Sequence, residues 1–232
     1  MSEVLFITGS TGIAAATAEM WRQTDPVFVM SKEMADVRDE VAVRRAVQAC
    51  LEAHGRIDAV FNVAGISARA FGDGPLHECS DAGWDEAMDV NAKGTFHVCR
   101  EVLQVWVEQK QTGVILNMGS VLARRPEAGG FGTVAYAASK GAIEAMSLAA
   151  AAYYAAAGIR INVIAPGLVR TPMSERAQAN PEILRFIEHK QPITHGMLSA
   201  DDVARMAVFL LRKNSSPVTG QVITVDGGWS VV

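Results

Sequence analysis

The sequence has few cysteines and no long hydrophobic run, and each shortage excludes a class of protein. Its three cysteines, Cys50, Cys79 and Cys99, lie far apart and form no Cys-x-x-Cys pair, so neither a disulfide framework nor a zinc site is expected. We expect all three to be buried as small hydrophobic residues. The longest unbroken apolar run covers only residues 148–157, whereas a membrane-spanning helix needs about 20 residues. No membrane partner is therefore predicted.

Positive charge is also in short supply. The chain has 21 Lys and Arg against 25 Asp and Glu, a formal net charge of −4. Such a balance provides no basic field to hold phosphate backbones, so nucleic acid is not an expected partner. The apolar segment at residues 4–7 lacks the basic flank and the length of an export signal. We therefore predict a cytoplasmic location.

No linker rich in Pro, Ser or charge divides the chain, so a single domain covering residues 1–232 is predicted. Short runs rich in Val, Ile and Phe alternate with stretches of helical periodicity. The strand-like runs are residues 4–8, 27–31, 57–63, 114–118, 159–165 and 221–225, and the helical stretches are residues 14–21, 40–52, 84–109, 135–157 and 200–211. This alternation predicts an α/β fold with a three-layer, doubly wound parallel sheet.

One connection is too short for a regular crossover. Only residues 32–35 separate the second strand from Asp36, and a parallel crossover needs a dozen or more residues. A helix and a further strand do not fit there. We therefore predict six strands, with the second at an edge of the sheet.

A glycine-rich turn joins the first strand to the first helix. Gly9 would allow a tight turn, Gly12 would let the backbone approach a ligand, and Ala14 would fit a close contact between helix and strand. A helix N-terminus in this position favours a pyrophosphate. The predicted phosphate-binding residues are Gly9, Ser10, Thr11, Gly12 and Ile13. The alternative is a turn that contains glycine for conformational reasons only.

The end of the second strand bears on the choice between NAD and NADP. An acid that binds the ribose hydroxyls of NAD is expected about 20 residues after the glycine loop, and Lys32 lies at this point, after Ser31. A lysine suits a 2′-phosphate better than a diol, which favours NADP. The alternative leaves Lys32 solvated and assigns the ribose to Glu33.

Tyr136 and Lys140 lie four residues apart at the start of a predicted helix, and therefore share one face. A phenol has a pKa near 10, so proton transfer near neutral pH requires a lower value, which a neighbouring ammonium could provide. Ser120 ends the strand at residues 114–118, at the edge where parallel sheets bind ligands. Its hydroxyl could hold a carbonyl oxygen, or it could simply terminate the strand.

Eight ordered matches along the chain resemble the short-chain dehydrogenase/reductase family from end to end. Besides the glycine loop and the Tyr136-x-x-x-Lys140 pair, they are Asp36-Val37, Asn62-Val63-Ala64-Gly65, Asn91, Asn117 through Ser120, Pro166-Gly167 through Thr171, and Val225-Asp226-Gly227-Gly228.

The resemblance implies a role for each matching residue. Tyr136 would be the catalytic acid/base, Ser120 would hold the substrate oxygen, and Lys140 would bind the nicotinamide ribose. Asn91 would anchor a water, or alternatively would bond the backbone of a bent helix. The implied cofactor contacts are Asp36 and Val37 at the adenine, Asn62 and Ala64 at the adenosine, and Val169 and Thr171 at the carboxamide. Gly65, Pro166 and Gly167 are further implied cofactor-binding residues. No metal is required.

Three features depart from the family pattern. The glycine loop is one residue shorter than usual, which affects Ser10 and Thr11, and the usual third strand with its preceding helix is missing. The segment between Ser120 and Tyr136 is longer than usual, and its additional Arg124-Arg125 and Gly129-Gly130 suggest an enlarged loop at the substrate entrance. The alternative leaves the two arginines solvated. Residues 171–198 would form a substrate lid with Met173, Phe186, Ile187 and Met197 as apolar contacts; helix packing explains these equally well.

The predicted function is hydride transfer between a nicotinamide cofactor and a secondary alcohol or carbonyl compound. One alternative is a 3-oxoacyl-carrier-protein reductase, but Gln111 and Ala157 stand where such enzymes often carry arginines. Another is a non-catalytic NAD(P) sensor or scaffold. The resemblance also implies a homo-oligomer, a dimer or tetramer formed through the helices at residues 84–109 and 135–157.

Overall fold

The sheet of the computed structural model, which describes residues 2–232, confirms the predicted α/β architecture. Its six strands run parallel in the order β2-β1-β3-β4-β5-β6. They are β1 (Leu5–Thr8), β2 (Val27–Met30), β3 (Ala59–Asn62), β4 (Gly113–Met118), β5 (Ile159–Pro166) and β6 (Val222–Val225). Each predicted strand is present, with its ends moved by no more than two residues.

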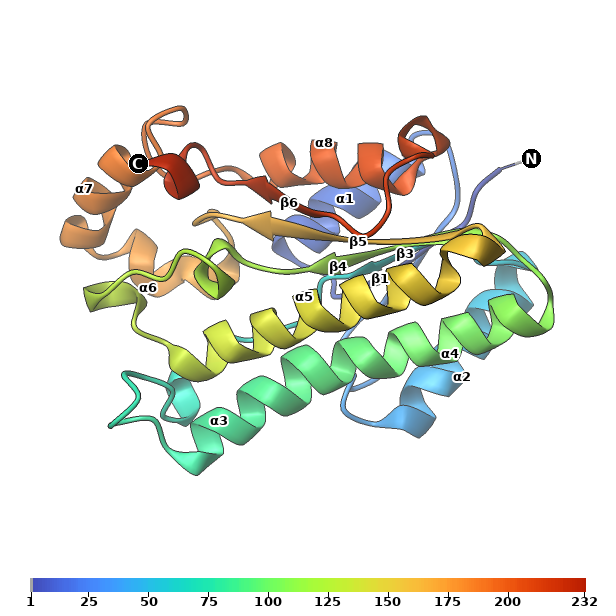
Figure 1. Ribbon diagram of the computed structural model, residues 1–232, viewed down its shortest axis with the longest axis horizontal. Helices are drawn as coiled ribbons and strands as arrows, with labels where there is room; N and C mark the ends of the chain where they lie inside the picture. The colour runs from blue at the N-terminus through green and yellow to red at the C-terminus, as the bar shows by residue number, and fades with distance from the viewer. Residues whose placement is uncertain (1) are drawn as a thin grey trace.

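Helices cover both faces of the sheet and complete the three layers (Figure 1). Helices α1 (Gly12–Arg22) and α8 (Ala200–Leu211) cover one face, and α2 (Glu40–His54), α4 (Gly94–Glu108) and α5 (Val134–Tyr154) cover the other. Short helices α6 (Glu175–Gln178) and α7 (Pro181–Lys190) lie beyond the carboxyl ends of the strands.

Alternate strand residues supply two separate cores. Phe6 pairs in register with Val60, and both pack in the cluster formed with α2 and α4. The next pair along, Ile7 and Phe61, packs in the cluster formed with α1 and α8. Because successive side chains of a strand point to opposite faces, near-continuous apolar runs fill both layers.

Strand β2 is a sheet edge, as predicted. Its only strand neighbour is β1, and three of its four residues are partly exposed. The chain passes from Met30 to the start of α2 at Glu40 without a further strand. Asp39 caps α2 by accepting hydrogen bonds from the backbone N–H groups of Val41 and Ala42.

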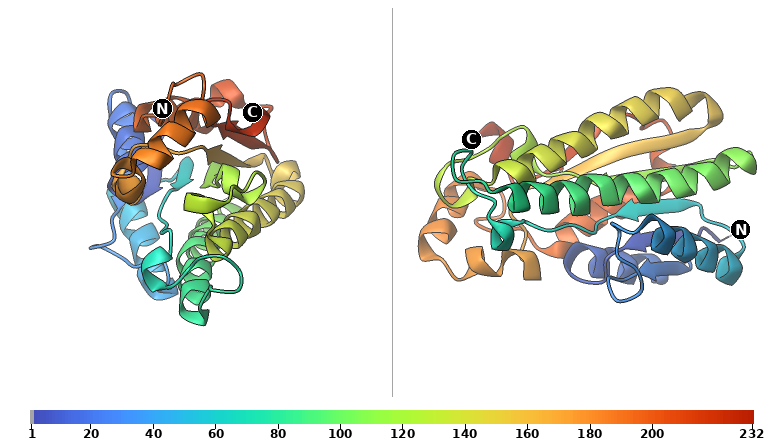
Figure 2. Two further views of the ribbon diagram at one scale, coloured as in Figure 1. Left: turned by 90° about the vertical axis from the view of Figure 1, so that its left-hand side faces the viewer. Right: turned by 90° about the horizontal axis from the view of Figure 1, so that it is seen from below.

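The long helix expected at residues 84–109 begins earlier and is interrupted. Ser80 accepts from the backbone N–H of Gly83 at 3.1 Å, so α3 (Asp81–Ala87) starts three residues before the predicted start. A π-helical turn, η2 (Met88–Lys93), joins α3 to α4. Helix α5 runs alongside this composite helix (Figure 2). A capping box starts α8, with Ser199 and Asp202 bonding reciprocally.

The prediction that all three cysteines are buried was wrong for one of them. Cys50 in α2 and Cys99 in α4 are buried, and burial raises the pKa of each thiol to about 12. Cys79 is half-buried, because it lies in the surface loop before α3, with Sγ 3.8 Å from the Asp73 carboxylate.

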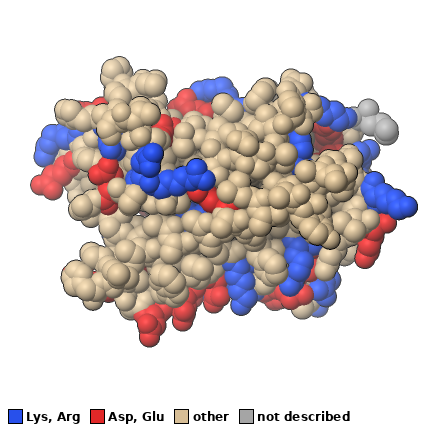
Figure 3. Space-filling model, viewed as in Figure 1, with Lys and Arg blue, Asp and Glu red and all other residues tan. Residues whose placement is uncertain are grey.

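The surface carries mixed charge. Figure 3 shows Lys and Arg interspersed with Asp and Glu, and the band along α5 is largely free of charged side chains. Among residues 2–232, no helix has the length and apolar character that crossing a membrane requires.

Candidate active site

A cavity of about 900 Å³ opens at the carboxyl edge of the sheet. Residues that directly follow four neighbouring strands line it: Gly9 after β1, Val63 after β3, Gly119 after β4 and Gly167 after β5. Strand β1 lies between β2 and β3, so the chain order reverses direction at this point. Open parallel sheets bind ligands at such a switch point.

The glycine turn adopts the conformation that its sequence suggests. Gly9 and Gly12 have φ of +92° and +52°, in the left-handed region that favours glycine. Helix α1 begins at Gly12, and Thr11 at its N-cap makes no side-chain capping bond. All residues from Gly9 to Ala14 line the cavity. The first turn therefore leaves backbone N–H groups without side-chain caps where an anion could bind.

Charged side chains of both signs line the cavity beyond the end of β2. Lys32, Glu33 and Asp36 all border the cavity, as does Arg38, which the sequence reasoning missed although it directly follows Asp36-Val37. Arg38 forms ion pairs with Asp36 at 2.7 Å and Glu86 at 3.0 Å. Hydrogen bonds from the Arg38 guanidinium lower the pKa of the Asp36 carboxyl.

The backbone between β3 and the cavity is fixed by Thr8. Its Oγ1 accepts from the N–H groups of Val63 and Ala64, at 3.0 and 3.1 Å. Ala64 and Gly65 line the cavity, as does Val37. A Cβ at Gly65 would lie 2.9 Å from Asn91 Oδ1, so this close approach requires glycine.

Two predicted site residues do not line the cavity. The Asn62 side chain is buried beneath it and donates to Asn117 Oδ1 at 2.8 Å. Asn91, in the π-helical turn, accepts from Ile66 N at 2.8 Å and donates to Ile66 O and to Ser139 Oγ. Both amides thus hold neighbouring elements together; the Asn91 side chain bonds the loop backbone at Ile66 and the Ser139 hydroxyl of α5, not the backbone of its own bent helix.

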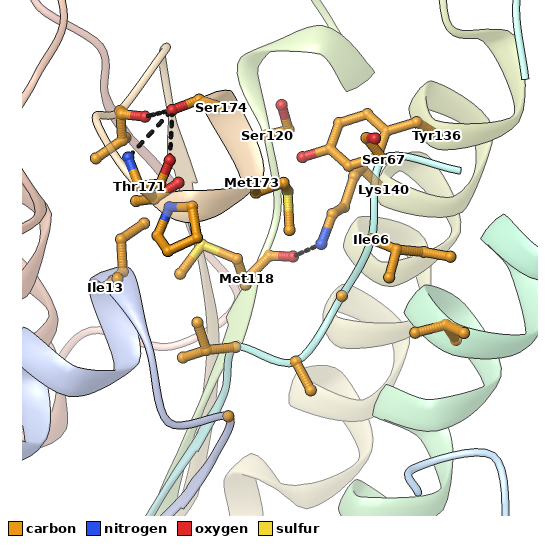
Figure 4. A pocket seen from close by; sticks show the side chains of 18 of the residues that line it. Ile13, Ile66, Ser67, Met118, Ser120, Tyr136, Lys140, Thr171, Met173 and Ser174 are labelled. Atoms are coloured by element: carbon orange, nitrogen blue, oxygen red, sulfur yellow. Dashed lines mark hydrogen bonds between the residues drawn. The ribbon is translucent and has the colours of Figure 1, made fainter. Parts of the chain in front are cut away.

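Ser120, Tyr136 and Lys140 meet at one wall of the cavity (Figure 4). Ser120 Oγ accepts from Leu122 N at 3.2 Å, and the Tyr136 phenol lies beside the Ser120 side chain. Lys140 Nζ donates to Met118 O at 2.9 Å and lies 5.6 Å from the centre of the Tyr136 ring. The three side chains come from the end of β4 and the first two turns of α5.

The pKa of the phenol differs from the prediction. Burial raises the pKa of Tyr136 above its ordinary value, and the neighbouring Ser120 hydroxyl offsets part of this rise. Lys140 makes no contribution to this shift; its ammonium lies 5.6 Å from the centre of the Tyr136 ring and donates to the Met118 carbonyl. Burial also lowers the pKa of Lys140 to about 8.

The segment that follows β5 also lines the cavity, through Pro166, Gly167, Val169 and Thr171. Thr171 N donates to Ser174 Oγ at 3.1 Å, and that hydroxyl donates to Val169 O at 2.7 Å; Figure 4 shows this cluster opposite Tyr136. A Cβ at Gly12 would lie 2.9 Å from Thr171 Cγ2, so the glycine turn and this segment meet across the cavity.

Comparison with known proteins settles what this arrangement is. A family model described as enoyl-(acyl carrier protein) reductase matches residues 7–230. The chain belongs to the short-chain dehydrogenase/reductase family. It is 32% identical to the 3-oxoacyl-[acyl-carrier-protein] reductase FabG of Thermotoga maritima, over 97% of both chains. It is 36% identical to the (2S)-[(R)-hydroxy(phenyl)methyl]succinyl-CoA dehydrogenase subunit BbsD of Thauera aromatica, over 85% of this chain and 75% of that one.

Solved structures agree with the sequence matches. The structure of ElxO with NADP bound superposes with a TM-score of 0.88 at 25% identity, covering 100% of both chains. As a short-chain dehydrogenase/reductase, the chain is a nicotinamide-dependent oxidoreductase of alcohols and carbonyl compounds. The residues around the cavity offer the glycine turn and the uncapped helix start that such a cofactor requires.

A buried carboxylate positions the Tyr136 helix of this short-chain dehydrogenase/reductase. Asp73 accepts from Ala135 N at 3.0 Å and from Tyr136 N at 2.9 Å, whereas the N-cap residue Thr133 makes no side-chain cap. Sequence reasoning missed Asp73. No local pattern identifies it, because it lies in a loop more than sixty residues before the helix that it caps.

The substrate end of the cavity is formed by the long loop before α5 and by the segment that includes α6 and α7. Gly130 and Phe131 line the cavity as the enlarged loop predicts, but Arg124 and Arg125 do not. Arg124 instead pairs with Glu144 of α5 at 2.5 Å.

The expected lid segment, residues 171–198, divides between two environments. Met173 lines the cavity and is half-exposed. Ile187 is fully buried in the cluster that includes Trp229, and Phe186 contacts that indole ring at 6.0 Å between centroids. Met173 thus faces the cavity, and Ile187 packs against the body.

Proposed function

We propose that the chain transfers a hydride between a nicotinamide cofactor and a secondary alcohol or carbonyl compound, with Tyr136 as the acid/base. The observation that carries this proposal is the meeting of the Ser120 hydroxyl and the Tyr136 phenol at the cavity wall, with Lys140 one helical turn further on. A bound nicotinamide supplies the hydride donor or acceptor.

In the reducing direction, the Tyr136 hydroxyl gives its proton to the substrate oxygen while the Ser120 hydroxyl donates a hydrogen bond to the same oxygen. Because the phenol is buried, its anion needs a nearby positive charge. The Lys140 ammonium provides that charge and holds the nicotinamide ribose. We assign Asn91 to anchoring a water that resupplies the proton.

A Tyr136→Phe variant tests this mechanism. We expect kcat for NADPH-dependent reduction of a carbonyl panel to fall by about a hundredfold or more, because general acid catalysis contributes about that much. Binding of NADPH, followed by its fluorescence, should be unchanged. Tyr153→Phe is the matched control, since Tyr153 lies on the same helix and is 78% exposed. Full turnover by Tyr136→Phe would refute the assignment.

We propose NADP as the preferred cofactor, with Lys32 as the partner of its 2′-phosphate. Lys32 lines the adenosine end beside the Asp36–Arg38 pair. A hydrogen bond from the Ser31 hydroxyl lowers the pKa of the Glu33 carboxyl, so Glu33 already has a partner next to Lys32. ElxO, of similar fold, has been solved with NADP bound.

Lys32→Ala should raise KM for NADPH about tenfold and leave KM for NADH unchanged, as expected for the loss of one charge-assisted contact. Steady-state kinetics with both cofactors measures this. A Glu33→Ala variant is the counter-test: a shift in preference toward NADPH in that variant, with Lys32→Ala silent, would assign the ribose to Glu33 and the cofactor to NAD.

We also propose that the chain folds as one domain and assembles as a dimer or tetramer through α4 and α5. Exposed apolar side chains on these helices support the assembly: Phe96 and Val107 on α4, and Leu148 and Tyr153 on α5. The substrate lid at residues 171–198 remains part of the proposal, with Met173 as its residue in the cavity.

A further inference from the structure

Two arginines from different parts of the chain converge on one carbonyl at the substrate end of the cavity. Arg69 follows β3, in the 3-10 turn Arg69–Phe71, and Arg176 lies in α6. Nη2 of each donates to Gly130 O at 2.7 Å. Both side chains line the cavity, together with Ser120 and Tyr136. Two like charges therefore share a single neutral acceptor.

No carboxylate neutralises this pair. Among residues 2–232, no ion pair involves Arg69 or Arg176, and each makes one hydrogen bond, the bond to Gly130, although a guanidinium has five donors. Burial and the charge of Arg176 lower the pKa of Arg69. The charge of Asp73 opposes this lowering but does not outweigh it. The Asp73 carboxylate accepts hydrogen bonds from the backbone N–H groups of Ala135 and Tyr136 in α5.

Apolar side chains line the same cavity as the arginine pair. Phe71, Phe131, Met173 and Trp229 are among its lining residues, and the rings of Phe131 and Trp229 meet edge to face at 5.2 Å. Arg69 is partly buried, so water screens its attraction to an anion less than at an open surface, whereas Arg176 is exposed. Guanidinium donors suit flat or tetrahedral oxyanions, which they bind in pairs.

From this geometry we infer that Arg69 and Arg176 form an anion subsite, so that the substrates of this enzyme carry an oxyanion at the end remote from the reacting carbonyl or hydroxyl carbon. Carboxylate, sulfonate and phosphate share the required chemistry. The chain between the reacting carbon and the anion lies against the apolar side chains. This inference rests on the proposed function, because Ser120 and Tyr136 define the reacting end.

The test uses matched ketones that differ in charge. NADPH-dependent reduction of 4-oxopentanoate, 5-oxohexanoate and 6-oxoheptanoate is compared with that of their methyl esters. We expect kcat/KM to be at least tenfold higher for the acid than for its ester at the best chain length. Oxoalkyl sulfonates and phosphates of that length then show which oxyanion the subsite prefers.

The variants are Arg69→Gln and Arg176→Gln, with Arg185→Gln as the matched control, because Arg185 is an exposed arginine of α7 that does not line the cavity. Loss of either arginine should lower kcat/KM for the acid by about tenfold to a hundredfold, the effect of one charge-assisted contact. The ester should change less than twofold. The control should behave as the unmodified protein does.

Three results would overturn the inference. The value of kcat/KM could fall equally for the acid and the ester in the variants, which would mean that the arginines only hold the loop at Gly130 in place. The unmodified protein could show no preference for the acid. NADPH affinity could fall in Arg69→Gln and Arg176→Gln, which would place the arginines at the cofactor phosphates.

Binding separates this inference from the proposed function. Affinity of the oxo acids for the NADPH complex, measured by calorimetry, should depend on both arginines whether or not turnover occurs. Arginine-dependent binding without reduction of any ketone would support the subsite and refute the proposed chemistry. Reduction whose rate depends neither on the two arginines nor on the charge of the substrate would support the proposed chemistry and refute the subsite.

Discussion

Lys140 is a cationic side chain in an almost enclosed position. Its residue is 3% exposed, its ammonium donates to the Met118 carbonyl, and burial lowers its pKa to about 8. Burial of a cation costs folding free energy unless an opposite charge compensates it. No carboxylate pairs with Lys140 in the part of the chain that the structure describes, so no opposite charge offsets this cost.

The cost predicts a pH dependence of stability. Below pH 8 Lys140 is protonated in both the folded and the unfolded state, and the penalty is complete. Between pH 8 and about 10.4 the unfolded state binds more protons, so the free energy of unfolding rises with pH through this group. Relative to Lys140→Met, the unmodified protein should gain about 3 kcal/mol across this range.

Urea unfolding of both proteins at several pH values measures the gain. Lys213→Met is the control, because the Lys213 side chain is 88% exposed and its difference from the unmodified protein should not vary with pH. A constant difference for Lys140→Met would show that the ammonium is solvated.

Spacing was enough to predict that Tyr136 and Lys140 share one helix face, because four residues make about one turn. Spacing could not predict what the ammonium contacts. Met118 O lies at the end of β4, and only the packing of β4 against α5 brings the two together. The same holds for Arg69 and Arg176, whose shared acceptor Gly130 is distant from both in the sequence.

At the scale of elements, α5 depends on a cap from outside its own sequence. Asp73 bonds the N–H groups of Ala135 and Tyr136, and a carboxylate also interacts favourably with the positive end of a helix. The helix start fixes the position of Tyr136. Asp73 therefore acts as a positioning residue for the proposed acid/base.

Asp73→Ala should lower the free energy of unfolding by about 2 kcal/mol and also reduce kcat with little effect on KM for NADPH. Asp73→Asn, which keeps one acceptor oxygen, should recover part of the lost free energy of unfolding and part of the lost kcat. Ser199→Ala is the matched control, because it removes the cap of α8, whose residues do not line the cavity. A control that lost as much kcat as Asp73→Ala would show that stability alone explains the effect.

Strands were the most predictable elements, because each is a short apolar run bounded by polar residues or glycine, and β1 and β3 to β5 are buried almost throughout. The long helix was predicted less well. Its start depends on the Ser80 cap, and its π-helical turn at Met88–Lys93 leaves no mark in the apolar periodicity.

On the scale of the whole molecule, the outer face of α5 exposes small and apolar side chains. Leu148 is exposed among the small exposed residues Ala145, Ala149 and Ala152, which share one helix face. Ala151, in contrast, is buried in the subunit's own core. Figure 3 shows few charged side chains along this helix.

Leu148→Arg should weaken self-association at least a hundredfold, because an unpaired charge would be buried in the contact. Light scattering after size exclusion at several protein concentrations measures the assembly. Leu76→Arg serves as the control, since Leu76 is 77% exposed and lies in the loop before α3, outside the exposed face of α5. An unmodified protein that is monomeric at all concentrations would contradict the proposed assembly.

The missing strand was the whole-molecule feature that the sequence predicted best, because a connection of a few residues physically excludes a crossover. The cavity as a whole could be expected at the carboxyl edge. The positive charge in the cavity could not be expected from the sequence, since Arg38, Arg69 and Arg176 reach the cavity from three separate segments.

The π-helical turn has a consequence for how this chain tolerates insertions and deletions. Each residue of an α-helix advances about 100° around the axis, and a π-helical turn accommodates one additional residue. Removing one residue from Met88–Lys93 would let a regular helix form, but it would rotate Asn91 away from Ile66 and Ser139, which its amide holds together. The length of this turn is therefore constrained by the contacts that Asn91 makes.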